Sequence, residues 1–109
     1  MKKWDIEYIE EAVEDLKGLT KANQLQVLKA IDKVSENPLP NHKGGYGKPL
    51  GNKMGTNLSG YQKIKLKKAG LRVVYSLQQE NETMKIIIIS VRDDEKVYKM
   101  AQHRISKMD

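Results

Sequence analysis

Cations at a spacing of two residues are the feature of this sequence best suited to chemistry. Lys63, Lys65 and Lys67 are separated by single apolar residues. Because alternate side chains of a strand point to opposite faces, the three lysines would share one face. A turn follows, and an antiparallel return strand would bring Arg72 beside them. Like charges that face one another across a sheet are destabilising, so the pattern predicts a surface that binds an anion.

Positive charge on a rigid sheet suits phosphodiester cleavage in RNA. The nucleophile is then the 2′-hydroxyl of the substrate, and the protein supplies a base, an acid and positive charge that stabilises the phosphorane. A lysine crowded by other cations can serve as the base, because its charged form is disfavoured. Arginine stays protonated and grips phosphate with two hydrogen bonds, a role that suits Arg72 and Arg92.

Other common catalytic designs lack their residues here. The cluster that we single out has no Ser-His-Asp set, no phosphate-loop glycine pattern and no paired carboxylates on a common face. The chain has no cysteine, and its two histidines, His42 and His103, lack the spacing of metal ligands. We therefore expect neither a metal ion nor a cofactor.

Each candidate also has a structural interpretation. The lysines would suit the solvated face of an edge strand, where they discourage aggregation. Tyr98 follows Val97, a residue of an apolar stripe, and would suit the boundary of the core. Arg92 would pair with the acidic residues at 93–95. The spacing alone leaves these alternatives open.

The charge of the chain is unevenly distributed. Among its 109 residues the formal net charge is +6, and residues 1–40 hold six cations and eight anions, whereas residues 41–109 hold fourteen and six. This asymmetry indicates that a polyanion such as nucleic acid faces the second half. A solvated basic surface on an ordinary domain is the alternative.

Length and composition also predict the setting of the protein. A chain of 109 residues suits one domain that spans residues 1–109. It begins without an apolar leader and has no apolar run of roughly 18 residues. Together with the absence of cysteine, these features predict a cytoplasmic protein with no membrane contact.

Hydrophobic periodicity predicts the order β-α-α-β-β-β-α. The expected elements are a strand at 3–7, helices at 9–18 and 20–35, strands at 61–67, 71–79 and 86–91, and a helix from about 93. Thr20 can cap the second helix, which has an apolar stripe of Leu25, Leu28, Ile31 and Val34, joined by Val27. Val97, Ala101, Ile105 and Met108 form the inner stripe of the last helix. Residues 37–60 are expected to form an irregular loop, and its length indicates a function, an unrecognised short element or disorder.

These elements predict an α+β fold. We expect a small single domain with a largely antiparallel four-stranded sheet, on which the first two helices pack as a hairpin. The strand at 86–91 is apolar on both faces, so it should lie centrally and be covered by helix.

Several motifs together resemble the RelE family of bacterial toxins. They are the stretch from Tyr61 to Tyr75, the run Ile89-Ser90-Val91-Arg92, and the pair Val97-Tyr98. The similarity extends over nearly the whole chain and implies a microbial-ribonuclease-like fold. It further implies a ribosome-dependent endonuclease that cleaves mRNA in the A site without a metal ion. A cognate antitoxin, the ribosome with its 16S rRNA, and mRNA would be its partners.

The resemblance also implies roles for single residues. Lys63 and Lys65 match two strand lysines that bind the phosphate and are candidates for the base. Arg72 matches an arginine that stabilises the phosphorane. Arg92, matched across a two-residue gap, corresponds to the proposed proton donor to the leaving 5′-oxygen. Tyr98 matches a tyrosine that stacks with the substrate or orients it around the 2′-hydroxyl.

Three further cations are expected to bind RNA more generally: Lys67, Lys68 and Arg104. Two other functions fit the same sequence. One is a ParE-like protein that inhibits DNA gyrase, although such relatives generally lack the cationic cluster. The other is a basic nucleic-acid-binding module without catalysis.

Overall fold

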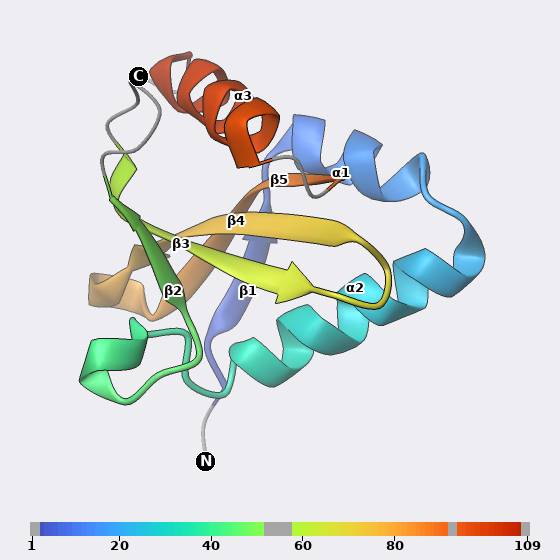
Figure 1. The fold of residues 1–109 in the computed structure, drawn as a ribbon. Helices are drawn as coiled ribbons and strands as arrows, with labels where there is room; N and C mark the ends of the chain where they lie inside the picture. Colours follow the sequence, from blue (N-terminus) through green and yellow to red (C-terminus); the bar gives the residue numbers. More distant parts are fainter. Residues whose placement is uncertain (1–2, 52–57, 92–93, 108–109) are drawn as a thin grey trace.

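The computed structural model describes residues 3–51, 58–91 and 94–107. In this part of the chain one sheet has the strand order β1-β5-β4-β3-β2 (Figure 1). The strands are β1 (Asp5–Tyr8), β2 (Lys48–Gly51), β3 (Leu58–Leu66), β4 (Leu71–Gln78) and β5 (Thr83–Val91). The α-helices are α1 (Glu10–Lys17), α2 (Lys21–Val34) and α3 (Asp94–Ser106). Short 3-10 turns lie at Asn41–Lys43 and Gln79–Asn81.

The α+β fold and the predicted order of elements are confirmed, with one strand added. Strand β1 pairs with β5 in parallel, and every other pairing is antiparallel. The added strand, β2, lies in the stretch predicted as irregular and pairs with β3 at the edge of the sheet. It has four residues and contains Pro49, which an edge strand tolerates because it needs hydrogen bonds on one side only. Its brevity and its proline hid it from periodicity.

Helices cover both faces of the sheet (Figure 1). The predicted hairpin of α1 and α2 packs on one face, and α3 packs on the other. Thr20 caps α2, as predicted, because its hydroxyl accepts a hydrogen bond of 3.2 Å from the Asn23 amide. None of the described helices combines the length and apolar character that a membrane span requires.

The predicted apolar stripe of α2 was wrong at its N-terminal end. The buried residues are Val27, Ile31 and Val34, whereas Leu25 and Leu28 are 59% and 42% exposed. Positions 27, 31 and 34 follow the i, i+4, i+7 spacing of one narrow helix face. The sequence contains more apolar residues than this face can place against the sheet.

A β-bulge divides the four consecutive isoleucines of β5 between the two faces of the sheet. Val74 pairs with Ile88 and Tyr75 pairs with Ile86, so Ile87 is an extra residue in β5. Ile87 and Ile88 both pack in the core under α3, whereas Ile86 and Ile89 pack in the core under α1 and α2. The expectation of a strand that is apolar on both faces and covered by helix on at least one side is confirmed, and helices cover both sides.

Candidate functional site

The register of β3 and β4 brings the predicted cations together. Lys65 pairs with Arg72 directly across the strands, and Lys63 pairs with Val74. Val74 belongs to the core under α3, so these side chains lie on the face of the sheet that carries α3. Ser90 of β5 pairs with Arg72 from the other side. The shared face predicted from the two-residue spacing is therefore observed for Lys63, Lys65 and Arg72, whereas Lys67 lies in the turn after β3.

Lys63 is buried and bonded to the predicted tyrosine. Its Nζ donates a hydrogen bond of 2.8 Å to the hydroxyl of Tyr98 and lies 5.3 Å from the centre of that ring. Lys63 is 8% exposed and Tyr98 is 1% exposed. An ammonium group is costly to bury without partners, and this hydrogen bond supplies one. The contact joins β3 to α3.

Tyr98 is a core residue and is buried more deeply than a position at the boundary of the core would be. It lies on the buried side of α3 and shares a core cluster with Leu50, Val97 and Ala101. Stacking on a base requires an exposed ring face. In this conformation the Tyr98 hydroxyl accepts the hydrogen bond from Lys63 Nζ and fixes the position of that nitrogen.

Strand β2 adds a cation that the sequence did not reveal. Lys48 pairs with Lys63, and directly opposite residues of an antiparallel pair share a face. Lys48 is exposed. Leu50, two residues later, lies in the core under α3, which confirms that this face is shared. Lys48 was missed because its strand was read as loop.

The remaining predicted residues differ in their surroundings. Arg72 is partly buried, and Lys67 and Lys68 are exposed in the turn between β3 and β4. This turn was predicted, and Gly70 adopts the positive φ of 67° that it requires. Arg92 lies outside the described residues, as does Met108.

Arg104 has a structural set of partners. Its NH1 and NH2 atoms donate to the two carboxylate oxygens of Asp15 at 2.6 and 3.1 Å, and NH1 also donates to the carbonyl of Ile87 at 3.0 Å. Asp15 accepts a hydrogen bond of 3.0 Å from the amide of Ile89. The side chains of Arg104 and Asp15 are only 12% and 18% exposed. The predicted contact of Arg104 with RNA has no support in this geometry.

The end of β1 explains this arrangement. The last pair between β1 and β5 joins Tyr8 to Ile86, and α1 begins shortly afterwards. Backbone groups of β5 beyond this point therefore have no strand beside them on that edge. Asp15 from α1 and Arg104 from α3 supply the missing hydrogen bonds at Ile89 and Ile87. The pair thus joins α1, β5 and α3.

Tyr75 anchors the loop after α2 to the opposite face of the sheet. Its hydroxyl donates a hydrogen bond of 2.8 Å to the carbonyl of Pro38, and burial raises the pKa of Tyr75. Gly47 lies so close to this hydroxyl that a Cβ there would clash with it.

Among the described residues, no three carboxylate, imidazole or thiol groups gather where they could hold a metal ion.

Comparison with solved structures identifies the fold. A double-mutant form of the toxin RelE of E. coli, in its free state, aligns with 95% of this chain and 99% of its own length at a TM-score of 0.73 and 24% identity. The chain has the fold of the RelE toxins. No family model and no curated protein matches the chain in sequence.

Two further structures share the RelE fold. The RelBE2 toxin-antitoxin complex of Mycobacterium tuberculosis matches 84% of this chain and 100% of its own, with a TM-score of 0.67 and 23% identity. A YoeB/ParE toxin of Agrobacterium tumefaciens matches 82% and 99%, with a TM-score of 0.61 and 16% identity. At these identities the likeness concerns the fold, and the function has to be argued from the residues of this chain.

Proposed function

We propose that this protein is the toxin of a toxin-antitoxin system and a ribosome-dependent endoribonuclease that cleaves mRNA in the A site. The observation that carries the proposal is the cationic face of β3 and β4, where Lys65 pairs with Arg72 and Lys63 is bonded to Tyr98. The RelE fold supports the same activity. In this proposal amino-acid side chains carry out the reaction without a metal ion or a cofactor.

The proposed reaction is an internal transfer within the RNA. The 2′-oxygen attacks the adjacent phosphorus while its proton passes to a base. The bond from phosphorus to the 5′-oxygen then breaks, and that oxygen takes a proton from water, while the proton held by the base returns to the solvent. The products are a 2′,3′-cyclic phosphate and a 5′-hydroxyl. Negative charge accumulates on the phosphorane oxygens between these steps, and fixed positive groups stabilise it.

Lys65 and Arg72 are the proposed binding groups for the phosphorane. Directly opposite residues of an antiparallel pair have Cβ atoms about 4.5–5.5 Å apart, so both side chains can reach one phosphate group. The guanidinium offers two parallel donors, and the ammonium offers a point charge. Because the sheet holds both backbones, little reorganisation is needed during the reaction.

Lys63, Tyr98 and Arg92 complete the proposal. Lys63 is the candidate base: its ammonium group has to release a proton before the amine can accept one from the 2′-hydroxyl, and its bond to Tyr98 fixes the position of the nitrogen. For Arg92 we propose electrostatic stabilisation of the leaving 5′-oxygen, because the high pKa typical of arginine opposes proton donation. This last role rests on the resemblance of the sequence to the family.

The proposed partners are a cognate antitoxin, mRNA and the ribosome with its 16S rRNA, all in the cytoplasm. The M. tuberculosis structure with the same fold is a toxin-antitoxin complex, which supports an antitoxin here. The net charge of +6 supports binding to RNA. A positively charged protein reaches an RNA surface faster through long-range attraction.

Primer extension on mRNA from programmed ribosomes tests the proposed activity. The purified protein should cut the message at the A-site codon and should leave naked mRNA largely intact. Lys21→Ala removes an exposed lysine of α2 far along the chain from the site and serves as the control variant. Intact mRNA after incubation with folded protein and programmed ribosomes would contradict the proposal.

Inhibition of DNA gyrase is the second candidate, because the YoeB/ParE toxin of A. tumefaciens has the same fold. A supercoiling assay separates the two functions. If the protein abolishes supercoiling and leaves translation unaffected, it is a gyrase inhibitor and the nuclease function is wrong. Salt-sensitive RNA binding without cleavage would indicate a binding module.

A further inference from the structure

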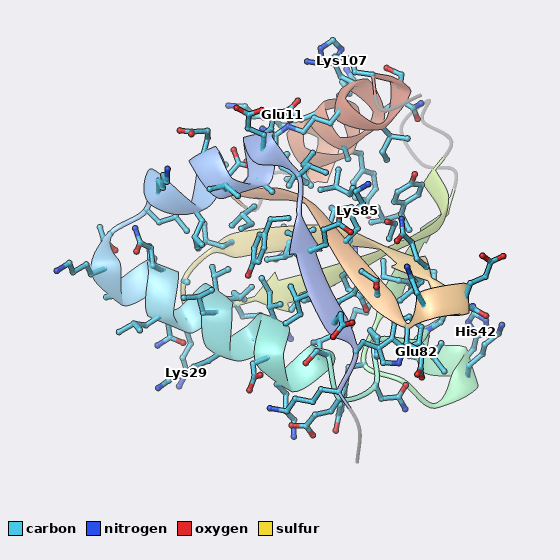
Figure 2. All side chains as sticks on the ribbon, turned by 180° about the vertical axis from the view of Figure 1, so that it is seen from behind. Glu11, Lys29, His42, Glu82, Lys85 and Lys107 are labelled. Carbon is cyan, nitrogen blue, oxygen red and sulfur yellow. The ribbon has the colours of Figure 1, made fainter. Side chains whose placement is uncertain are left out.

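Two exposed leucines lie in the middle of α2. Leu25 and Leu28 are 59% and 42% exposed, whereas the buried residues of this helix occupy a different side of it. Lys29, the residue after Leu28, extends from α2 into solvent (Figure 2). The fold of a single chain therefore leaves apolar surface of α2 in water, and a molecule that covers this surface gains free energy.

Residues of opposite charge flank these leucines along the helix. The four residues at successive spacings of four, three and four positions are Lys21, Leu25, Leu28 and Asp32. At 3.6 residues per turn, these positions lie within about 60° of one another around the helix axis. All four are exposed. We call them the α2 stripe, which is positive at its N-terminal end, apolar in the middle and negative at its C-terminal end.

The α2 stripe is complementary to a second copy of itself in antiparallel orientation. If a two-fold axis passes between residues 26 and 27, Leu25 of each copy faces Leu28 of the other. Lys21 of each copy then faces Asp32 of the other, and the axis repeats both contacts. A parallel pair would place lysine beside lysine and aspartate beside aspartate, which is unfavourable. The charges therefore select the antiparallel pair.

Both charged ends of the stripe are available for such contacts. In the part of the chain that the structure describes, no carboxylate pairs with Lys21. Asp32 accepts a hydrogen bond of 3.0 Å from Lys3, but the side chain of Asp32 is 60% exposed. A carboxylate has two oxygens that accept several hydrogen bonds, so Asp32 can bind a second cation.

The α2 stripe lies away from the proposed cleavage site. Helix α2 packs on one face of the sheet, and α3 packs on the other (Figure 1). Lys65 and Arg72 belong to the face that carries α3. A second copy bound to α2 therefore leaves these cations open in both copies, and loss of the contact should leave RNA cleavage unchanged.

We propose that the α2 stripe is a contact between two copies of this chain, related by a two-fold axis with their α2 helices antiparallel. The inference goes beyond the proposed nuclease function and does not depend on it. One helix of each copy makes the contact, so the interface is small and the dimer is transient, with a Kd of roughly 10–100 µM.

Sedimentation velocity of charge variants, at protein concentrations below and above this Kd, tests the proposal. Lys21→Glu and Asp32→Lys each place like charges at both ends of the stripe, so each should weaken the dimer about tenfold. The double variant Lys21→Glu/Asp32→Lys restores opposite charges and should recover the wild-type Kd. Lys43→Glu changes the charge equally at an exposed lysine outside α2 and should have no effect.

Cross-linking tests the register of the contact. The chain has no cysteine, so an introduced cysteine reports on one position only. A mixture of Leu25→Cys and Leu28→Cys proteins should form a mixed disulfide dimer under mild oxidation, because these positions face one another across the axis. Either protein alone should cross-link at least about tenfold more slowly, since identical positions lie on opposite sides of the axis.

Three results would overturn the proposal. One is a wild-type protein that sediments as a monomer at every concentration, which would show that the leucines serve a different molecule. Another is a double charge variant that dimerises as weakly as the single variants. The third is equal cross-linking by the mixture and by each cysteine protein alone. None of these measurements requires RNA, so they decide the dimer even if the nuclease function is wrong.

Discussion

Lys63 on β3 and Tyr98 on α3 are joined by a buried hydrogen bond of 2.8 Å across 35 residues of sequence. The bond links the proposed catalytic face of the sheet to the helix that covers part of it. The position of α3 and the position of the candidate base are therefore coupled.

Removal of the Tyr98 hydroxyl should expose this coupling. Tyr98→Phe leaves the Lys63 ammonium buried without its acceptor, which we expect to cost about 1–3 kcal/mol of unfolding free energy. In a Lys63→Met background the charge is absent, so the same change should cost little. Urea unfolding of the two single variants and the double variant measures the coupling. Equal costs of Tyr98→Phe in both backgrounds would show that the bond contributes nothing.

The Asp15–Arg104 pair should be essential for stability. Arg104→Met leaves a largely buried carboxylate without its partner and removes a donor to the Ile87 carbonyl, so we expect a loss of about 3–5 kcal/mol. Lys3→Met breaks the exposed pair with Asp32 and should cost about 0–1 kcal/mol. Chemical unfolding compares them. A loss in Arg104→Met no larger than in Lys3→Met would refute the structural role.

Tyr75 should make the fold sensitive to alkaline pH. Burial raises its pKa above the ordinary value of 10.0, so the unfolded chain loses this proton at lower pH than the folded chain. The stability due to the neutral phenol is complete below about pH 10 and falls as the pH rises towards the raised pKa. Tyr75→Phe has no phenol proton to lose, so it lacks this pH-dependent change in stability. Its melting temperature should therefore decline less than that of wild-type protein above pH 10, and parallel declines would contradict the assignment.

Sequence periodicity captured the parts of the fold that depend on local pattern. The two-residue spacing placed Lys63 and Lys65 on one face because a strand has no other way to arrange them. Thr20 was found as a helix cap because it lies directly before a helical pattern. In both cases the deciding information lies within a few residues.

Features that depend on distant partners escaped prediction. Arg104 is separated from Asp15 by 89 residues, and nothing in its neighbourhood distinguishes a structural arginine from one that binds RNA. Strand β2 exists because β3 offers it an edge, although Pro49 opposes a strand locally. Leu25 and Leu28 have the apolar character of core residues, but the orientation of α2 on the sheet leaves them exposed.

Single-turnover cleavage of ribosome-bound mRNA by Arg72→Ala tests the central claim most directly. Arg72 is partly exposed beside Lys65, so its removal should leave the melting temperature nearly unchanged. We expect the cleavage rate to fall about 100- to 1,000-fold, as for the loss of one group that stabilises a transition state. Lys21→Ala should cleave at the wild-type rate and yield the same 2′,3′-cyclic phosphate. A well-folded Arg72→Ala protein that cleaves as fast as Lys21→Ala would contradict the claim that the paired face of β3 and β4 is the catalytic site.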